Sequence, residues 1–254
     1  MSPQLISEHN YYLHRSKDAE KDLSYISDYI NFDNKYVLEI GCGSGAKSVF
    51  FGRLASFAIG IDISEKVKLA PLLVDRNGNS DVNVRFSRAD AMALPFQSHS
   101  FDIVLLHDTM EHIPNPELVI QEASRVLKKG GTISIIMPHY YGLSGSHLWN
   151  YFSSSIWRYL HLHILIPGFL LRPMIGLIGK KRSYTTGQIN WEWNQFRTLN
   201  KLRTGYLKQI LEENHFDLEY VHLRRGRLPV QSLWSSPLVE ELFSWGIVIV
   251  ARKK

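Results

Sequence analysis

Between residues 35 and 138 the chain alternates between two patterns of hydrophobic and polar positions. Short runs are apolar nearly throughout, which is typical of strands buried on both faces of a parallel sheet. The stretches between them place apolar residues at helical spacing. This alternation predicts a doubly wound α/β sheet with right-handed crossovers. Strands are predicted at 36–41, 57–62, 82–90, 101–108 and 132–138, and helices at 46–56, 64–78 and 115–129.

The alternation breaks between residues 139 and 200, where the chain is rich in Trp, Tyr and His and then strongly apolar. It resumes with a predicted helix at 204–216 and predicted strands at 217–223 and 243–252, while residues 21–30 look helical and would lie outside the sheet. We therefore expect an N-terminal helical cap at 1–34, a ligand-binding core at 35–138, a lid insertion at 139–200, and the remainder of the core at 201–254.

Composition narrows the class of protein without naming a function. The 254 residues are 44% hydrophobic and 21% charged, as in ordinary globular proteins. The one cysteine, Cys42, excludes an internal disulfide, and the start of the chain lacks the pattern of a secretory signal, so we expect a cytoplasmic protein. The net charge of +5 mildly favours anionic partners.

Three glycines, Gly41, Gly43 and Gly45, follow the first predicted strand and precede a helix. Open α/β sheets bind ligands at this edge, and glycine permits close backbone approach. Asp62 ends the second strand, where a carboxylate can take both hydroxyls of a ribose. Glu39, beside the loop, would repel a pyrophosphate but suits a ligand with a cationic ammonium and sulfonium. The pattern therefore predicts an adenosine-type cofactor.

Five segments in order, "VLEIGCGSG", "IGIDIS", "RADAMALPF", "FDIVLLHDTMEHI" and "VLKKGGTISIIMP", resemble the class I S-adenosylmethionine-dependent methyltransferases over residues 36–138. The resemblance implies a Rossmann-like core whose seven-stranded, mostly parallel sheet closes with an antiparallel last strand. It also implies methyl transfer from S-adenosylmethionine, which leaves S-adenosylhomocysteine, to a small molecule, most often at oxygen.

The resemblance places the methionine part of the cofactor against the glycine loop. Glu39, Gly41, Cys42 and Gly43 would hold it, and Gly45 would complete the tight turn. Cys42 is interpreted as a small loop residue that contributes its backbone, and not as a nucleophile.

The adenosine part of the cofactor would lie beside the next two strand ends. The resemblance implies that Asp62 binds the ribose, Ile63 packs on the adenine, and Asp90 with Ala91 binds the adenine edge. His107, at the end of the fourth strand, would line the floor near the methionine.

Asp108, Glu111 and His112 fall at positions i, i+3 and i+4, so they would share one face of a helical turn. Such ligands suit Mg²⁺, and the set is similar to the E-x-x-E-H set of ubiquinone-pathway O-methyltransferases, with Asp108 in place of the first glutamate. The same Glu-His pair recurs in family members that need no metal. We therefore favour a site without a metal and keep a divalent ion as the alternative.

A hydroxyl acceptor also needs a general base. Members of the family commonly take substrate walls and the base from the region after the fifth strand. His139 is our first choice for the base and His147 the second, with His112 as a further candidate. For each of these histidines, a structural role is the competing interpretation.

The stretch 160–182 is apolar, but Pro167, Gly168 and Pro173 interrupt it, so a straight spanning helix is not expected. Short helices that form a lid or a dimer contact are the simpler interpretation. Peripheral contact with an anionic bilayer, through the cations at 180–182, is the alternative. Both a monomer and a homodimer stay open.

Two rival functions remain. The net charge and the "RRGR" at 224–227 suggest a nucleic-acid methyltransferase, but the chain has "HDTM" where enzymes that methylate base amino groups usually carry an Asn/Asp-Pro-Pro-aromatic loop. The other rival is a non-catalytic cofactor-binding partner subunit, and the intact acids Asp62 and Asp90 argue against it. A small-molecule substrate is therefore expected and a nucleic acid is not.

Overall fold

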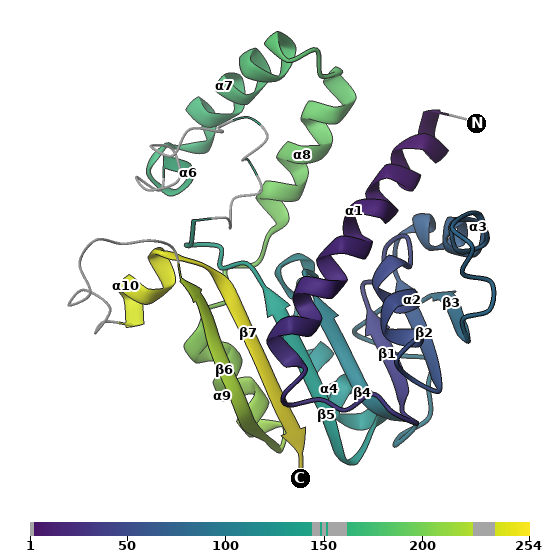
Figure 1. The fold of residues 1–254 in the computed structure, drawn as a ribbon. Helices are drawn as coiled ribbons and strands as arrows, with labels where there is room; N and C mark the ends of the chain where they lie inside the picture. The colour runs from purple at the N-terminus through teal and green to yellow at the C-terminus, as the bar shows by residue number, and fades with distance from the viewer. Residues whose placement is uncertain (1–2, 144–147, 149–150, 152–161, 226–236) are drawn as a thin grey trace.

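The structure, a computed structural model, describes residues 3–143, 148, 151, 162–225 and 237–254. Seven strands of this described part form one sheet in the order β3-β2-β1-β4-β5-β7-β6 (Figure 1). Neighbouring strands from β3 to β5 pair in parallel, and β7 runs antiparallel to both β5 and β6. The strands are β1 (Tyr36–Ile40), β2 (Phe57–Asp62), β3 (Val84–Arg88), β4 (Phe101–His107), β5 (Leu127–Met137), β6 (Phe216–Arg225) and β7 (Ser244–Lys253).

The helices of the described part flank this sheet or stand beyond its edge (Figure 1). They are α1 (Pro3–Ile26), α2 (Ala46–Gly52), α3 (Ala70–Arg76), α4 (Pro116–Val126), α6 (Leu162–Leu165), α7 (Gly168–Lys181), α8 (Thr186–Thr198), α9 (Thr204–Glu213) and α10 (Pro237–Leu242). Two 3₁₀ turns, η1 (Glu65–Leu69) and η2 (Met110–His112), follow β2 and β4.

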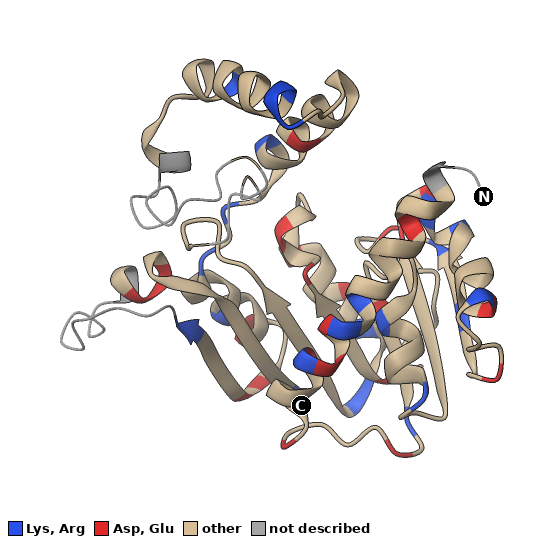
Figure 2. Cartoon of the chain, turned by 45° about the horizontal axis from the view of Figure 1, so that its top comes forward, with Lys and Arg blue, Asp and Glu red and all other residues tan. Residues whose placement is uncertain are grey.

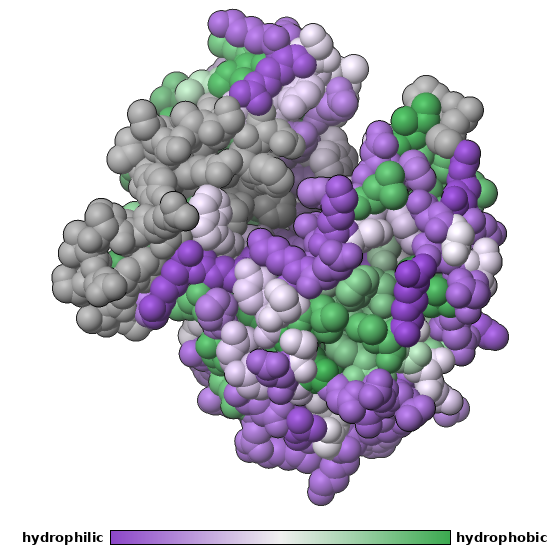
Figure 3. Space-filling view, viewed as in Figure 1, coloured by the Kyte–Doolittle hydropathy of each residue, from purple (hydrophilic) through white to green (hydrophobic). Residues whose placement is uncertain are grey.

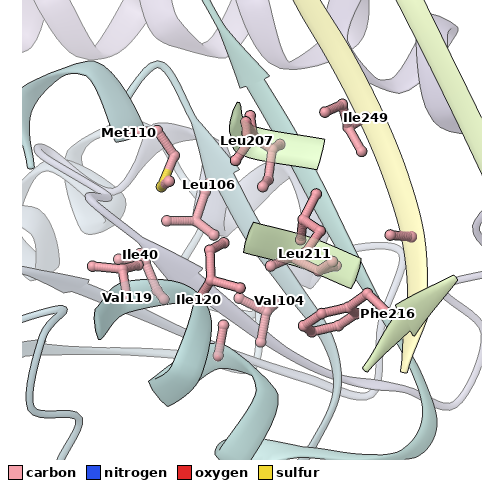
Figure 4. Packing of buried hydrophobic residues seen from close by; sticks show 14 of the residues in the cluster. Ile40, Val104, Leu106, Met110, Val119, Ile120, Leu207, Leu211, Phe216 and Ile249 are labelled. Atoms are coloured by element: carbon pink, nitrogen blue, oxygen red, sulfur yellow. The ribbon is translucent and has the colours of Figure 1, made fainter. Parts of the chain in front are cut away.

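The core is divided by the sheet because successive strand residues point to opposite faces. Leu38 of β1 packs in the cluster formed with α4 and α9, shown in Figure 4, while its neighbour Val37 packs in the cluster that contains Ile26 of α1 and Phe51 of α2. Helices on both faces explain why the central strands read as continuous apolar runs. The predicted fold class, with its antiparallel last strand, is confirmed.

Several predicted helices extend further than the observed ones, and two of these differences have a clear physical cause. The predicted helix 64–78 is divided into η1 and α3, because Pro71 stands at the start of α3 and cannot donate a backbone hydrogen bond. Ser64 does cap this segment, since its hydroxyl accepts from the Lys66 amide at 3.2 Å. The predicted helix 115–129 ends at Val126, because Leu127 adopts an extended backbone and begins β5.

The insertion after β5 carries the helices α6, α7 and α8 and stands beyond the carboxyl ends of the parallel strands (Figure 1). It has a small apolar core of its own, in which Leu171 and Ile175 of α7 meet Ile189 and Phe196 of α8. Its far end is attached to η2 through Asn200, whose backbone amide donates to the carbonyl of Glu111 at 2.8 Å. Within the described residues, no helix is long and apolar enough to cross a membrane.

Candidate active site

The glycine loop after β1 takes a path that only glycine follows easily. Gly41, Gly43 and Gly45 have φ of 80°, 53° and 86°, in the left-handed region. A Cβ on Gly41 would collide with the side chain of Thr109, and one on Gly45 with Phe86. A Cβ on Gly43 would meet only Tyr11, at 3.6 Å. Two of the glycines are therefore required for packing, and Gly43 is the one that borders open space.

Asp62 connects the end of β2 to this loop. One of its carboxylate oxygens accepts from the amide of Gly43 at 2.8 Å, and the other accepts from the amide of Ser64 at 2.8 Å. Ile63, the next residue, is 62% exposed although it is a large apolar side chain beside a buried strand. A carboxylate next to an uncovered apolar surface is the arrangement that a ribose with a planar base would fit.

Asp90 lies beyond the end of β3, the strand next to β2. One of its carboxylate oxygens accepts from the amide of Met92 at 2.8 Å, which fixes the turn that also holds Ala91. Ala91 is half-buried and packs against the core. The loops after β2 and β3 therefore carry the predicted adenosine-binding residues at the same edge of the sheet as the glycine loop.

Glu39 and Cys42 lie under the loop. Glu39 is 3% exposed and accepts a hydrogen bond from the Ser48 hydroxyl, and burial raises the pKa of its carboxyl. Cys42 is also buried, and burial raises the pKa of its thiol well above the ordinary value, with Glu39 and Asp62 adding to the effect. A thiol that stays protonated is a poor nucleophile, in line with the interpretation of Cys42 as a loop residue.

A buried charge cluster joins α1 to the end of β4, and the sequence reading missed it. Lys47 of α2 lies 2.5 Å from the carboxylate of Asp22 of α1 and 3.1 Å from that of Asp108. Arg15 of α1 donates to the same oxygen of Asp108 at 2.7 Å. Burial would raise the pKa of Asp108, but Lys47 and Arg15 together hold it well below its ordinary range. These ion pairs hold α1 against α2 and against the end of β4.

His107 lies on the floor of this cluster. Its Nε2 is 3.0 Å from the hydroxyl of Ser134, and its Nδ1 is 3.3 Å from the carboxylate of Asp22. Burial lowers the pKa of His107, although Asp22 opposes the shift. The ring is enclosed, so its position under the methionine end stays a prediction that rests on the resemblance.

Asp108, Glu111 and His112 do not form one ligand set. The Asp108 carboxylate is held by Arg15 and Lys47, and burial raises the pKa of Glu111 to about 8, with Asp108 adding to the effect. Among the described residues, no group of three His, Cys, Asp or Glu side chains could hold a metal ion.

The side chain of His112 is 34% exposed. Burial lowers the pKa of its imidazole, and the charges of Asp108 and Asp62 oppose the shift. The ring therefore stays neutral at neutral pH and lies within the electrostatic reach of both carboxylates. Of the two candidate bases that the structure describes, His112 and His139, it is the more exposed one.

His139, the first choice for a base, is 2% exposed, and both of its ring nitrogens have partners. Its Nδ1 is 2.6 Å from the hydroxyl of Ser244, which itself donates to the carbonyl of Glu241, so the imidazole donates to Ser244. Its Nε2 then accepts from the hydroxyl of Thr204 at 2.7 Å. This geometry favours the competing structural role. His147, the second choice, lies outside the described residues.

We expect the enclosed His139 to make stability depend on pH. Burial, reinforced by the charge of Arg224, lowers its pKa to about 4 from an ordinary value of 6.5. As the pH falls, the imidazole of the unfolded chain is protonated near pH 6.5, while that of the folded protein stays neutral down to about pH 4. The folded state is therefore fully stable above pH 6.5 and loses stability as the pH falls from 6.5 to 4. The loss amounts to about 3 kcal/mol. Urea unfolding of the wild type and of His139→Gln across this range measures it, and parallel curves for the two proteins would contradict the assignment.

Comparison with known proteins finds a family match within the core. Residues 38–135 match the family model described as a methyltransferase domain. A curated relative, the ubiquinone biosynthesis O-methyltransferase of Nitrosospira multiformis, is 33% identical over 112 residues, which cover 44% of this chain and 46% of the relative. The chain thus spans about half the length of the curated relatives it matches.

Solved structures share the fold over nearly the whole chain. An S-adenosylmethionine-dependent methyltransferase from Methanosarcina mazei aligns with a TM-score of 0.56 at 21% identity, covering 90% of this chain and 96% of that one. The cyclase SpnF aligns with a TM-score of 0.59 at 16% identity, covering 94% of this chain and 80% of that one. Since a protein named as a cyclase shares the architecture, the fold alone does not fix the reaction.

Proposed function

We propose that the chain transfers the methyl group of S-adenosylmethionine to an oxygen of a small, lipophilic acceptor, because residues 38–135 match a methyltransferase domain and a solved S-adenosylmethionine-dependent methyltransferase shares the fold. The observation that carries this proposal is the candidate cofactor site formed by Gly43, Asp62 and Ile63, in which a carboxylate bonds the amide of the open glycine of the loop and the next residue exposes an apolar side chain. The curated relatives are named as O-methyltransferases, which supports oxygen as the methylated atom.

The residues of the candidate cofactor site fit this cofactor. Asp62 would take the ribose hydroxyls, Ile63 would cover one face of the adenine, and Asp90 would accept from the adenine amino group. Glu39, buried under the loop, adds negative potential near the cationic methionine end. When bound, S-adenosylmethionine supplies a methyl group on an already activated sulfonium, so the protein contributes mainly alignment and exclusion of water.

The remaining chemical task is to remove the acceptor's proton. We assign it to His112, because its imidazole is partly exposed, feels the charge of Asp62 and stays neutral at neutral pH. His139 instead holds β5, α9 and β7 together. The apolar insertion supplies the wall for a lipophilic acceptor, since Tyr140 stacks on Phe196 of α8, with ring centroids 6.3 Å apart, beyond the end of β5.

The proposed function is tested by incubating the protein with methyl-labelled S-adenosylmethionine and a cell extract. We expect label in the organic-soluble fraction, released neither by nuclease nor by protease. Label confined to RNA or protein would replace the small-molecule acceptor with a macromolecule. Calorimetric binding of the cofactor with no labelled product in any fraction would favour the non-catalytic partner subunit.

Replacing His112 with glutamine should lower kcat by about 100-fold and leave cofactor affinity unchanged, because general-base catalysis contributes on this scale. In the wild type, kcat/KM should fall when the pH drops below the pKa of His112, which burial places under the ordinary value of 6.5. The variant should lose this decrease at acidic pH. The control is His14→Gln, at a side chain 68% exposed on α1. An unaltered pH profile in His112→Gln would remove His112 from the reaction.

A further inference from the structure

The insertion lies within a long stretch of the chain that has no acidic residue. No Asp or Glu occurs between Glu122 and Glu192, although this stretch contains eight Lys and Arg residues. Figure 2 shows this charge distribution on α7, which carries basic residues and no acidic one. A helical segment of one charge sign on a protein of modest net charge is a concentrated positive surface.

The helix α7 is apolar on its outer face as well as on its inner one. Leu171 and Ile175 point into the core of the insertion and are buried. On the other face, Phe169 is 77% exposed and Leu177, two turns later, is 65% exposed. Leu165 of α6, just before this helix, is 68% exposed. Helices of soluble monomers rarely expose such a surface, so we expect another apolar surface, from a protein or a lipid, to cover it.

Cations lie at one end of this apolar face. Lys180, Lys181 and Arg182 end α7 and are exposed, and Figure 3 shows hydrophobic and hydrophilic residues side by side at the tip of the insertion. A groove of about 360 Å³ lies between α7 and α8. Its walls include Lys180 and Leu177 and a further cation, Arg172. Apolar side chains next to clustered ammonium and guanidinium groups match the acyl region and the anionic headgroups of a lipid surface.

We propose that the outer face of α6 and α7 docks on an anionic lipid bilayer, with Leu165, Phe169 and Leu177 in the acyl boundary and the basic tip on the headgroups. Charge complementarity selects this occupant over a second copy of the chain, because two identical basic surfaces repel each other. Docking needs neither cofactor nor acceptor, so it stands or fails separately from the proposed function. If both hold, a lipophilic acceptor reaches the candidate cofactor site from the bilayer side.

Co-sedimentation of the full chain with vesicles tests the proposal. Wild type should pellet with phosphatidylcholine vesicles that contain phosphatidylglycerol, bind at least about ten-fold more weakly to phosphatidylcholine alone, and dissociate as salt is raised. Lys180→Glu/Lys181→Glu should reduce binding at least ten-fold, and Phe169→Ser/Leu177→Ser should abolish it. Matched controls, which should bind like wild type, are Lys17→Glu/Lys21→Glu on α1 and Leu72→Ser/Leu118→Ser on α3 and α4, all at exposed positions.

Circular dichroism and cofactor affinity establish that each variant is folded, and a variant that fails this check is replaced by the single change Phe169→Ser or Lys181→Glu. Equal binding to neutral and anionic vesicles, or no binding by the wild type, would overturn the proposal. So would a wild-type dimer that Phe169→Ser dissociates without any change in vesicle binding, since a second copy would then be the occupant.

Discussion

Replacing Asp62 with alanine should weaken the binding of S-adenosylmethionine at least about 100-fold. A hydrogen bond to a charged group contributes about 1.5–3 kcal/mol, and the carboxylate would lose its bonds to two ribose hydroxyls. The same carboxylate also accepts from the amides of Gly43 and Ser64, so its removal releases the loop that it would position. Asp62→Asn keeps one acceptor oxygen and should fall between wild type and alanine. Calorimetry with the cofactor and with S-adenosylhomocysteine measures the effect.

The matched control is Asp217→Ala, whose side chain is 67% exposed on β6 and pairs only with Lys254 in the described part of the chain. It should bind the cofactor like wild type. An Asp62→Ala protein that is folded and binds within three-fold of wild type would remove the ribose role from this residue, and with it the observation that carries the proposed function.

Replacing Lys47 with methionine should lower the free energy of unfolding by about 3–5 kcal/mol, because the buried charge cluster loses the cation that contacts both of its acids. The Lys47 side chain is 3% exposed between Asp22 and Asp108. Burial would raise the pKa of Asp22, but His107 and Lys47 lower it overall, so both acids are charged in the wild type. The loss of stability in the variant should become smaller as the pH falls, since protonation of the buried carboxylates removes the negative charge that Lys47 no longer compensates. Urea unfolding at pH 7 and pH 5 measures both effects.

Lys128→Met is the comparison for Lys47→Met. Lys128 pairs with Asp102 at 2.9 Å, but its side chain is 41% exposed, so its loss should cost at most about 1 kcal/mol. The double variant Lys47→Met/Asp22→Asn should recover part of the loss. Equal costs for Lys47→Met and Lys128→Met would mean that water reaches the cluster and that the ion pairs do not hold α1.

The fold could be predicted because its signal is local. The apolar run at Phe57–Asp62 begins and ends where β2 does, since a strand buried on both faces must be apolar throughout. The errors arose where tertiary pairing overrode a local pattern. Leu127 continues a helical pattern in sequence, but its backbone pairs with Phe101 of β4 and so starts β5.

The candidate site could be predicted in part, for the same reason. Asp62 and Asp90 follow strands, and strand ends meet at one edge. His139 also follows a strand, but its partners Thr204 and Ser244 are 65 and 105 residues away, and no pattern around it shows that both nitrogens are engaged. The ion pairs of α1 were missed because the orientation of a helix on the core follows from packing and not from its own sequence.

Asn200 gives the insertion a mechanical connection to the proposed reaction centre. Its amide group donates to the carbonyls of Met110 and Ile113, at 2.5 and 2.8 Å, and its backbone amide donates to Glu111. These three bonds bracket η2, the turn that carries His112. A displacement of α8 therefore either breaks them or drags the imidazole along. A surface that binds the outer helices and shifts α8 would therefore change the rate of turnover as well as the location of the molecule.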